Sequence, residues 1–261
     1  MIAVCLKWVQ PHGAADDRFA GISAADQSAL ELALCTAEAR GDDVVAITVG
    51  PVGAERALRD ALACGANRAV RIATEPGVSS LRTATALADA IGAADVVWCG
   101  DYSADRGSGS VPAFLAARLG IDQALGLIDL EINGNGSQIR AVRRLDGGRR
   151  EVLSINGRAV LSVEGSTARL RRAPLRSVIA ADSAQIDVRV LESPDVTAVD
   201  LVAYRPRARV LPAPSGAQAL DRVRALTDTG AAPSRTETVV LEPDAAARRI
   251  LDTLRDWGYL T

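Results

Sequence analysis

The chain has 261 residues, of which 48% are hydrophobic and 24% charged, with a formal net charge of -2 at pH 7, as is ordinary for a soluble globular protein. The slight negative charge excludes a general electrostatic attraction to nucleic acid or anionic membranes, and charges or glycines interrupt every apolar run before the roughly 20 residues that a membrane span needs. The N-terminal run MIAVCLKWVQ is shorter and more strand-like than a signal peptide, so we expect a cytoplasmic protein with no nucleic-acid partner and no membrane span.

Apolar strand-like runs alternate with helix-like runs over the first 120 residues. The pattern predicts strands at 1–9, 42–50, 69–73 and 94–100, and helices at 22–40, 54–64, 79–92 and from Ser110 through Leu119. Uninterrupted apolar strands between helices are typical of a parallel sheet that is covered on both faces. Because such crossovers are right-handed, we expect an α/β fold with a doubly wound, mainly parallel sheet.

Beyond residue 120 the pattern changes to short strands at 124–132, 137–145, 150–155 and 159–163. The segments NGNG (133–136) and DGG (146–148) are typical of hairpin turns. We therefore expect added antiparallel strands and hairpins at one side of the sheet. The next stretch, 165–184, carries several arginines and Pro174 and has no clear periodicity.

The C-terminal part is rich in Pro, Arg, Ala, Ser and Gly over 205–235, with one helical stretch at 217–226. A strand-like run at 237–242 leads through Pro243 into a predicted helix at 244–257. The sequence thus predicts an α/β domain over 1–190 and an extended C-terminal arm over 191–261, which ends in a helix and packs on its own body or on a partner.

Four cysteines, Cys5, Cys35, Cys64 and Cys99, are spread along the first part of the chain without a C-x-x-C pair. We interpret them as reduced thiols that behave mostly as small buried hydrophobes. No metal site is expected, because His12 is the single histidine. No paired carboxylates or nucleophile elbow emerge from the spacing, which argues against hydrolytic catalysis.

Ligands of open parallel sheets bind beyond the carboxyl ends of the strands, where the strand order reverses. The sequence places distinctive residues at such ends, at Lys7 and Trp8, at 50–51 and at 100–110, and the segment 21–26 can approach the same edge. Lys7 is interpreted either as a ligand contact or as a solvated lysine at a strand end. Arginines 171, 172 and 176 form either a solvated charged face or a docking patch.

The segment CGDYSADRGSGSVPAFLAARLG (99–120) is the best candidate for a phosphate site. Gly107 and Gly109 allow close approach of the backbone, and the N-terminus of the following helix favours an anion. Asp105 disfavours a cluster of phosphates and suits a contact to ribose or adenine. The alternative is a capped turn that binds no ligand, since the spacing matches neither G-x-x-x-x-G-K-[ST] nor G-x-G-x-x-G.

Several motifs follow one another along the first 190 residues. They are VCLKWV (4–9), SAADQSALELA (23–33), TVGP (48–51), LRDALACGANR (58–68), the candidate loop with Gly100, Asp105, Ser108, Ser110 and Val111, then DGG (146–148), AVLS (159–162) and RRAPLR (171–176). In this order they resemble the β subunit of electron transfer flavoprotein, a family with an adenine-nucleotide-binding, Rossmann-like fold.

The resemblance implies an electron carrier rather than an enzyme. Members of this family bind AMP as a structural group in the β subunit, and help to hold FAD at the interface with an α subunit, which contributes most of the flavin site. Electrons pass from a partner dehydrogenase, which carries a flavin or another redox cofactor, to the FAD and onward to an acceptor.

The resemblance also implies two sets of site residues. Cofactor contacts carry over to Cys5, Lys7, Ser23, Ala24, Ala25, Asp26, Val49, Gly50, Gly100, Asp105, Gly107, Ser108, Gly109, Ser110 and Val111. The loop that recognises the partner carries over to Arg172, Ala173, Pro174, Leu175 and Arg176, with Leu175 as the anchor.

The chain departs from the family pattern at several of these positions. Ser23 and Ala24 replace an N-P turn, Tyr102 replaces a glutamine, and Gly107 replaces the second acid of the nucleotide loop. The segment AADSA (180–184) replaces a lysine-rich run. These departures indicate a specialised branch of the family, for which a redox-peptide pathway of the mycofactocin type is a candidate.

Two other classes of protein share features with this chain. GSGS (107–110) before a helix resembles the phosphate loop of stand-alone universal-stress-protein modules, which commonly lack the hairpins, the recognition-like loop and the arm. A nucleotide-dependent ligase or adenylyltransferase is disfavoured, because the H-x-G-H and S-G-G-x-D-S signatures are absent.

Overall fold

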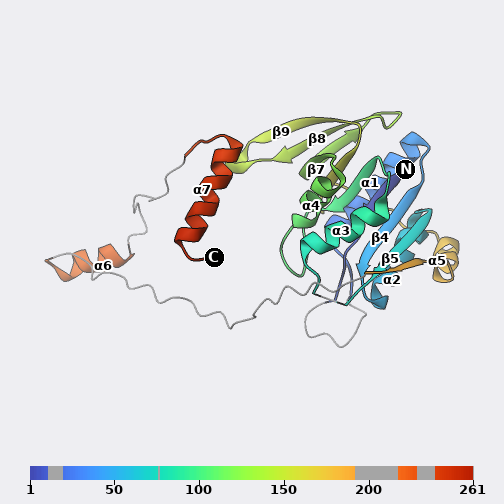
Figure 1. Ribbon diagram of the computed structural model, residues 1–261, viewed down its shortest axis with the longest axis horizontal. Helices are drawn as coiled ribbons and strands as arrows, with labels where there is room; N and C mark the ends of the chain where they lie inside the picture. The colour runs from blue at the N-terminus through green and yellow to red at the C-terminus, as the bar shows by residue number, and fades with distance from the viewer. Residues whose placement is uncertain (11–19, 76, 192–216, 228–238, 261) are drawn as a thin grey trace. The chain divides into compact units, whose positions relative to one another are not determined.

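The computed structural model describes residues 1–10, 20–75, 77–191, 217–227 and 239–260 (Figure 1). By its internal contacts the chain divides into two compact units, residues 1–198 and 199–261. The first unit contains, in chain order, β1 (Ile2–Cys5), β2 (Trp8–Val9), β3 (Gly21–Ile22), α1 (Ala24–Arg40), β4 (Val44–Gly50), the short 3-10 turn η2 (Val52–Ala54), α2 (Glu55–Cys64), β5 (Arg68–Ala73), α3 (Ser80–Ile91), β6 (Val96–Gly100), α4 (Ser110–Leu119), β7 (Asp122–Ile132), β8 (Gln138–Arg144), the turn η3 (Asp146–Gly148), β9 (Arg150–Asn156), β10 (Ala159–Val163), α5 (Leu175–Asp182) and β11 (Asp187–Val190).

A nine-stranded sheet with the order β11-β5-β4-β1-β6-β10-β7-β8-β9 forms the centre of this unit. The strands from β11 to β7 are parallel, and β8 and β9 join β7 as antiparallel strands. From β1 the chain moves outward through β4 and β5 and then returns to β6 on the other side of β1. The strand order therefore reverses between β1 and β6, and the predicted doubly wound fold is confirmed.

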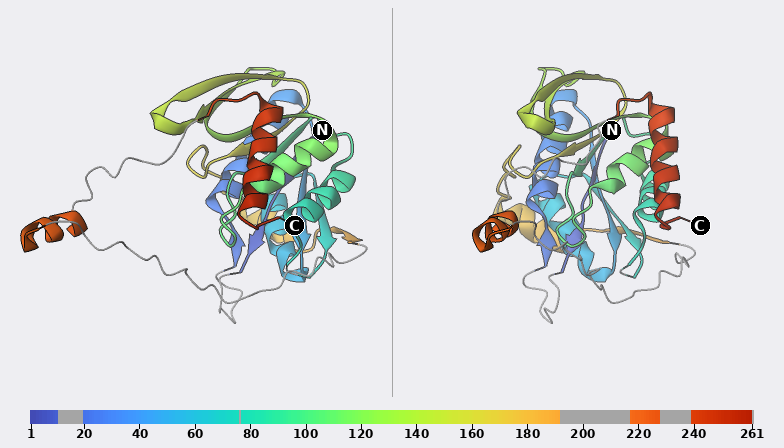
Figure 2. Two further views of the ribbon diagram at one scale, coloured as in Figure 1. Left: turned by 60° about the vertical axis from the view of Figure 1, so that its left-hand side comes forward. Right: turned by 90° about the vertical axis from the view of Figure 1, so that its left-hand side faces the viewer.

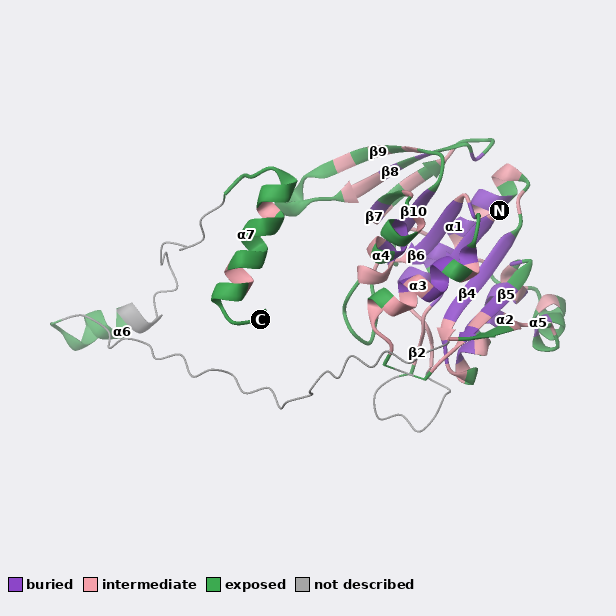
Figure 3. Cartoon of the chain, in the orientation of Figure 1, coloured by how far each residue is buried: buried purple, intermediate pink, exposed green. Residues whose placement is uncertain are grey.

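Helices cover both faces of the sheet, as the two views of Figure 2 show. Alternation along β1 divides the core: Ile2 and Val4 pack with α1 and α2, whereas Ala3 and Cys5 pack with α3 and α4. All four residues of β1 are buried, as are the first five residues of β4, so the central strands are apolar on both faces (Figure 3). This explains why their sequences read as continuous apolar runs.

The helix boundaries follow from local residue chemistry. Ser23 caps α1 through its Oγ, which accepts the N–H of Asp26 at 3.1 Å, and Gly41 ends the helix with a left-handed φ of 69°. Ser79 caps α3 in the same manner. Ser23 and Gly41 therefore set the two ends of α1.

The strands beyond residue 120 are only partly antiparallel. β8 and β9 form the expected hairpin around the DGG turn, but β10 lies between β6 and β7 and is parallel to both. All five residues of β10 are buried. Its insertion into the centre of the sheet depends on contacts distant in sequence, which hairpin patterns do not report.

Two elements between residues 165 and 190 were not predicted. Helix α5 begins at Leu175, so the expected recognition loop ends as the first turn of a helix. The edge strand β11 pairs in parallel with β5. Both elements are short and largely exposed, which leaves little hydrophobic periodicity in their sequences.

The described residues of the second unit contain the helices α6 (Ala219–Thr227) and α7 (Pro243–Asp256). The strand predicted at 237–242 is wrong over 239–242, which has no strand structure, and its first two residues lie outside the described part of the chain. The arm predictions over 192–216 and 228–236, and His12, also lie outside the described residues. In the described ranges no helix combines the length and hydropathy that a bilayer crossing requires.

Candidate functional site

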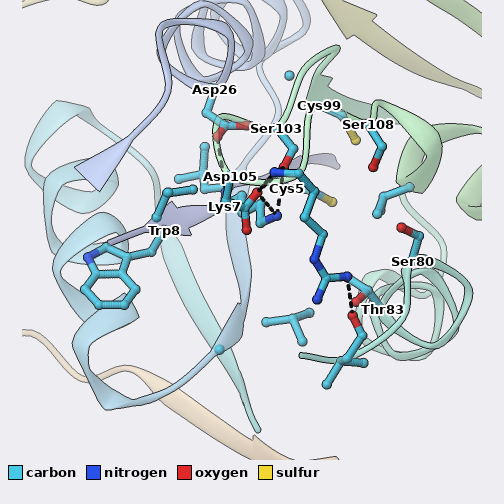
Figure 4. A pocket seen from close by; sticks show the side chains of 18 of the residues that line it. Cys5, Lys7, Trp8, Asp26, Ser80, Thr83, Cys99, Ser103, Asp105 and Ser108 are labelled. Atoms are coloured by element: carbon cyan, nitrogen blue, oxygen red, sulfur yellow. Dashed lines mark hydrogen bonds and ion pairs between the residues drawn. The ribbon is translucent and has the colours of Figure 1, made fainter. Parts of the chain in front are cut away.

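A pocket of about 350 Å³ lies at the carboxyl ends of β1, β4, β5 and β6 (Figure 4). Its floor includes Cys5 and Cys99, which are direct neighbours in the β1–β6 register at the point where the strand order reverses. A hydrogen bond between the two thiols, with burial, raises the pKa of Cys99. The Cys99 thiol is therefore a protonated part of the floor rather than a reactive thiolate.

Lys7 joins β1 to the loop between β6 and α4. Its Nζ donates to Asp105 Oδ1 at 2.5 Å and to Ser103 Oγ at 2.8 Å. Burial by itself would raise the pKa of Asp105, but the hydrogen bonds from Lys7 and Ser103 and the lysine charge hold this pKa at about 2. Lys7 therefore forms an ion pair at the pocket rim, with its side chain 42% exposed (Figure 4).

Asp26 is a buried carboxylate at the start of α1 that also lines the pocket. Its Oδ2 accepts from Ser23 Oγ at 3.1 Å and from the N–H of Lys7 at 3.3 Å. The backbone N–H of Ser23 also bonds to this carboxylate, which together with the Ser23 cap makes a capping box. The contact with the N–H of Lys7 joins α1 to the end of β1. Burial outweighs these hydrogen bonds and raises the pKa of Asp26 to about 6.

The glycines around this loop are fixed by the space and the backbone conformation at each position. A Cβ on Gly109 would lie 2.0 Å from the carbonyl oxygen of Asp101, and a Cβ on Gly100 would lie 2.7 Å from Asp26 Oδ1. Gly107 has a φ of +66°, with open space around its Cα. Gly109 is therefore required for close packing within the loop, and Gly107 allows a left-handed turn.

The N-termini of α3 and α4 border the same side of the pocket. Ser80 and Thr83 line it from α3 and Ser108 from the loop before α4, opposite Trp8 (Figure 4). Ser79 caps α3, whereas no side-chain hydrogen bond caps α4 at Gly109 in the described structure. The first N–H groups of α4, with the helix dipole, thus form the place in this pocket where an anion is most favoured.

The structure brings most of the predicted cofactor residues to this pocket. Those that line it are Cys5, Lys7, Asp26, Val49, Gly50, Gly100, Asp105, Ser108, Gly109 and Val111. Those that do not line it are Ser23, Ala24, Ala25, Gly107 and Ser110. Ser23 acts on the pocket through Asp26, and Ala25 is buried in the core.

Sequence reasoning missed the β5–α3 side of the pocket. Its lining residues there are Thr74, Glu75, Gly77, Val78, Ser80, Thr83 and Leu87. Arg106 connects this side to the β6–α4 loop, because its guanidinium donates to the carbonyl of Val78 at 3.0 Å. The carboxyl end of the third predicted strand was the available signal, since the same rule that selected the other strand ends applies to it.

The predicted partner segment 172–176 lies next to α2. It is therefore on the face of the sheet that α1 and α2 cover, and not on the face covered by α3. Leu175 is 75% exposed at the start of α5, and Arg172 and Arg176 are also exposed. Arg171 behaves differently, because it forms ion pairs with Glu31 and Glu38 of α1. The interpretation of Arg171 as part of a solvated or docking face is therefore wrong.

This arrangement can bind a small polar ligand with one anionic end, and it offers no evident reactive group. The pocket volume lies within the range of small-molecule sites. In the described ranges, no cluster of three or more His, Cys, Asp or Glu side chains could hold a metal ion. The carboxylate of Asp105 is paired with Lys7, and that of Asp26 accepts hydrogen bonds from Ser23 and Lys7.

Comparison with protein families matches residues 14–196 to the electron transfer flavoprotein domain. The β subunit of electron transfer flavoprotein from Methylophilus methylotrophus is 30% identical over 191 residues, which cover 71% of this chain and 72% of that protein.

Two other kinds of relative support the same similarity. The protein FixA of Azorhizobium caulinodans is 32% identical over 171 residues, or 62% of this chain, and the aligned part spans 60% of FixA. The β subunit of electron transfer flavoprotein from Mycobacterium tuberculosis is 32% identical over 155 residues, which cover 57% of this chain and 56% of that protein.

Proposed function

The chain belongs to the electron transfer flavoprotein family, among its β subunits, and from this premise we propose that it forms a heterodimeric electron carrier with an α subunit. In this proposal the β6–α4 pocket binds AMP. The chain also helps to hold an FAD that the α subunit carries, and a partner dehydrogenase supplies the electrons. When bound, the flavin supplies the redox chemistry, whereas the nucleotide takes no part in it.

The uncapped N-terminus of α4 is the observation that carries the nucleotide proposal. It faces the pocket between Ser108 and Val111. A single phosphate would therefore accept hydrogen bonds from backbone N–H groups at this helix end, which has no side-chain cap. The nearest cations do not add to a larger phosphate site, because Lys7 is paired with Asp105 and Arg106 is bonded to Val78. A monophosphate therefore suits the pocket better than a triphosphate.

This chain's own residues would shape the site rather than react. Lys7 and Asp105 fix the loop over the pocket, and Asp26 fixes the start of α1 beside it. The buried thiols of Cys5 and Cys99 exclude water from the floor. We propose that the FAD is held mainly by the α subunit. The residues that line this pocket include no second cluster of cations that could hold the diphosphate of FAD.

The proposal is tested by co-expressing the chain with an electron transfer flavoprotein α subunit. The purified complex should show a flavin absorption spectrum and release about one AMP per heterodimer on denaturation, measured by chromatography. A panel of flavin-dependent dehydrogenases then identifies a donor that reduces the flavin. A chain that stays monomeric and prefers ATP in calorimetry would instead support the stress-protein alternative.

A charge at the proposed phosphate position makes the test specific. Ser108→Asp places a carboxylate at the start of α4, so AMP should be lost while the chain still folds. Ser137→Asp makes the same chemical change at an exposed turn after β7 and should leave the AMP content unchanged. Equal AMP content in both variants would contradict the phosphate position.

A further inference from the structure

Helix α5 presents an apolar face to solvent. Leu175, Val178 and Ile179 are 75%, 46% and 65% exposed, and their spacing places them on one side of the helix. Ala181 is the only buried residue of α5, and Figure 3 shows most of this helix as exposed. A helix of eight residues is not stable alone, and the burial of one alanine fixes its orientation weakly. Other contacts must therefore hold α5 in place.

The segment before α5 is held by Arg171, whose backbone and side chain both bind α1. Its N–H donates to Glu31 Oε2 at 2.9 Å, and its guanidinium makes a two-pronged contact with the same carboxylate at 2.9–3.1 Å. Glu38 pairs with the outer edge of the guanidinium. The carbonyl of Arg171 accepts from Cys64 Sγ of α2 at 3.7 Å. Arg171 is thus fixed between two helices.

A row of polar side chains along α1 contacts the segment 165–171 that leads into α5. Ser28, Glu31, Cys35 and Glu38 follow one another at helical spacings of three and four, and each contacts the segment 165–171. Ser28 Oγ lies 2.7 Å from the carbonyl oxygen of Ala168. The Glu31 side chain is 15% exposed and that of Arg171 32%. Burial alone would raise the pKa of Glu31, but the hydrogen bonds from Arg171 hold it below its ordinary value.

The other end of α5 is held by Arg59 of α2. Its Nη1 lies 2.9 Å from the carbonyl oxygen of Ala181 and 2.6 Å from that of Asp182. Both carbonyls belong to the last turn of α5, and that of Ala181 also accepts from the backbone N–H groups of Ser183 and Ala184. A cation at this position also complements the negative end of the helix dipole. Arg59 therefore caps α5 from a neighbouring helix.

We propose that Glu31 and Arg59 are positioning residues for partner docking. Glu31 holds the segment that leads into α5 and Arg59 holds the end of α5, so the face formed by Leu175, Val178 and Ile179 is kept in one orientation. This inference rests on the proposed function, and on the expectation from the family resemblance that the segment 172–176 recognises the donor dehydrogenase. A face that is already ordered loses less conformational entropy on binding, so these distant contacts strengthen docking without touching the partner.

The test uses the complex of the full chain with its α subunit and three variants. Glu31→Gln removes the charge that holds Arg171, and Arg59→Met removes the cap on α5. Glu131→Gln is the matched control, because it removes an exposed carboxylate from the Arg140 ion pair between β7 and β8. Each complex is measured for flavin and AMP content, for amide hydrogen exchange over 175–182, and for KM and kcat with the donor found under the proposed function.

Faster amide exchange in α5 and a higher KM are expected for Glu31→Gln and Arg59→Met. If α5 has its wild-type orientation only a tenth of the time in a variant, the apparent affinity for the donor falls by the same factor. The KM should then rise about tenfold with kcat nearly unchanged. The flavin and AMP contents should stay at wild-type values, because neither residue lines the pocket. The reversed pair Glu31→Arg with Arg171→Glu should restore much of the wild-type KM, which a general loss of packing would not allow.

Wild-type exchange and KM in both variants would overturn the inference. If Glu31→Gln fails to fold, Glu38→Gln replaces it, since this outer carboxylate is 61% exposed and its loss should shift exchange and KM in the same direction. If no donor reduces even the wild-type complex, the docking role is overturned with the proposed function. Unchanged KM with a working donor, by contrast, overturns the positioning role alone.

Discussion

Lys7 and Asp105 form an ion pair at 2.5 Å across 98 positions of sequence. The pair connects the end of the first central strand, β1, to the loop after β6, on the other side of the strand-order reversal. Ser103 lies in the same contact and donates to the Asp105 carboxylate. The loop over the pocket is therefore tied to the strand that forms its floor.

Lys7→Met should raise the pKa of Asp105 from about 2 toward the ordinary aspartate value of 3.8. Because the folded-state pKa is lowered, the stabilisation from this pair is complete above about pH 3.8 and is lost as the pH falls toward about 2. Exposed pairs contribute only about 0.2–1 kcal/mol, so the variant should fold. NMR titration of the carboxyl carbons measures the shift, and an unchanged Asp105 pKa would refute the role of Lys7.

Asp26→Asn should remove one pH dependence of stability. The folded-state pKa of Asp26 is raised from 3.8 to about 6, so the folded protein binds more protons than the unfolded chain between these values. The contribution of Asp26 to stability therefore falls as the pH rises through this window. Urea unfolding across the same window should show a shallower fall for Asp26→Asn than for the wild type. Parallel curves would contradict the raised pKa.

Gly109→Ala should destabilise the β6–α4 loop and lower the AMP content. The new Cβ would meet the carbonyl oxygen of Asp101 at 2.0 Å, and backbone on both sides must move to relieve this contact. Gly134→Ala is the control, because a Cβ there meets no atom within 4 Å and the residue has no left-handed φ. Thermal unfolding and nucleotide release compare the two. Similar behaviour of both variants would show that the loop tolerates a side chain at 109.

Leu175→Ala should slow electron exchange with the donor dehydrogenase and leave the flavin in place. Leu175 is 75% exposed, so its loss should change folding little, whereas a buried anchor at an interface is worth roughly 2–4 kcal/mol. Val152→Ala in β9, at 55% exposure, is the control for truncating an exposed apolar side chain. Stopped-flow reduction of the flavin measures the effect, and unchanged kinetics would exclude a docking role.

Deletion of residues 205–261 should weaken assembly with the α subunit more than it affects folding of the first unit. The chain divides into units at 198–199, so the sheet keeps all of its strands after this deletion. Thermal unfolding of the truncated chain and its co-purification with the α subunit measure the two effects. Equal loss of stability and of assembly would show that the second unit belongs to the core of the first.

The sequence predicted the central α/β fold well because its information is local. Apolar runs such as VVAITVG, the Ser23 cap and the Gly41 end specify strands and helix boundaries through neighbouring residues alone. The same reasoning failed for β10 and β11, whose places in the sheet depend on pairing with β6 and β5. It also failed for 239–242, where strand-like residues form no strand.

The candidate site was partly predictable for the same reason. The rule that ligands bind at strand ends selected Lys7, Gly50 and the loop from Gly100, all of which line the pocket. The β5–α3 side was missed although the rule covered it. The partners of single side chains were not predictable, because the contacts of Lys7 with Asp105 and of Arg171 with Glu31 join residues far apart in sequence.

The sequence by itself determined the strands and helices of the first 120 residues, the family motifs and several of the strand ends that line the pocket, because each depends on residues within one turn or one strand. The tertiary structure decided which charges are paired. Lys7 pairs with Asp105 of the β6–α4 loop, Gly109 packs against the carbonyl of Asp101, and Arg171 pairs with Glu31 of α1. These outcomes depend on distances between separate elements, which exist only after the sheet has assembled.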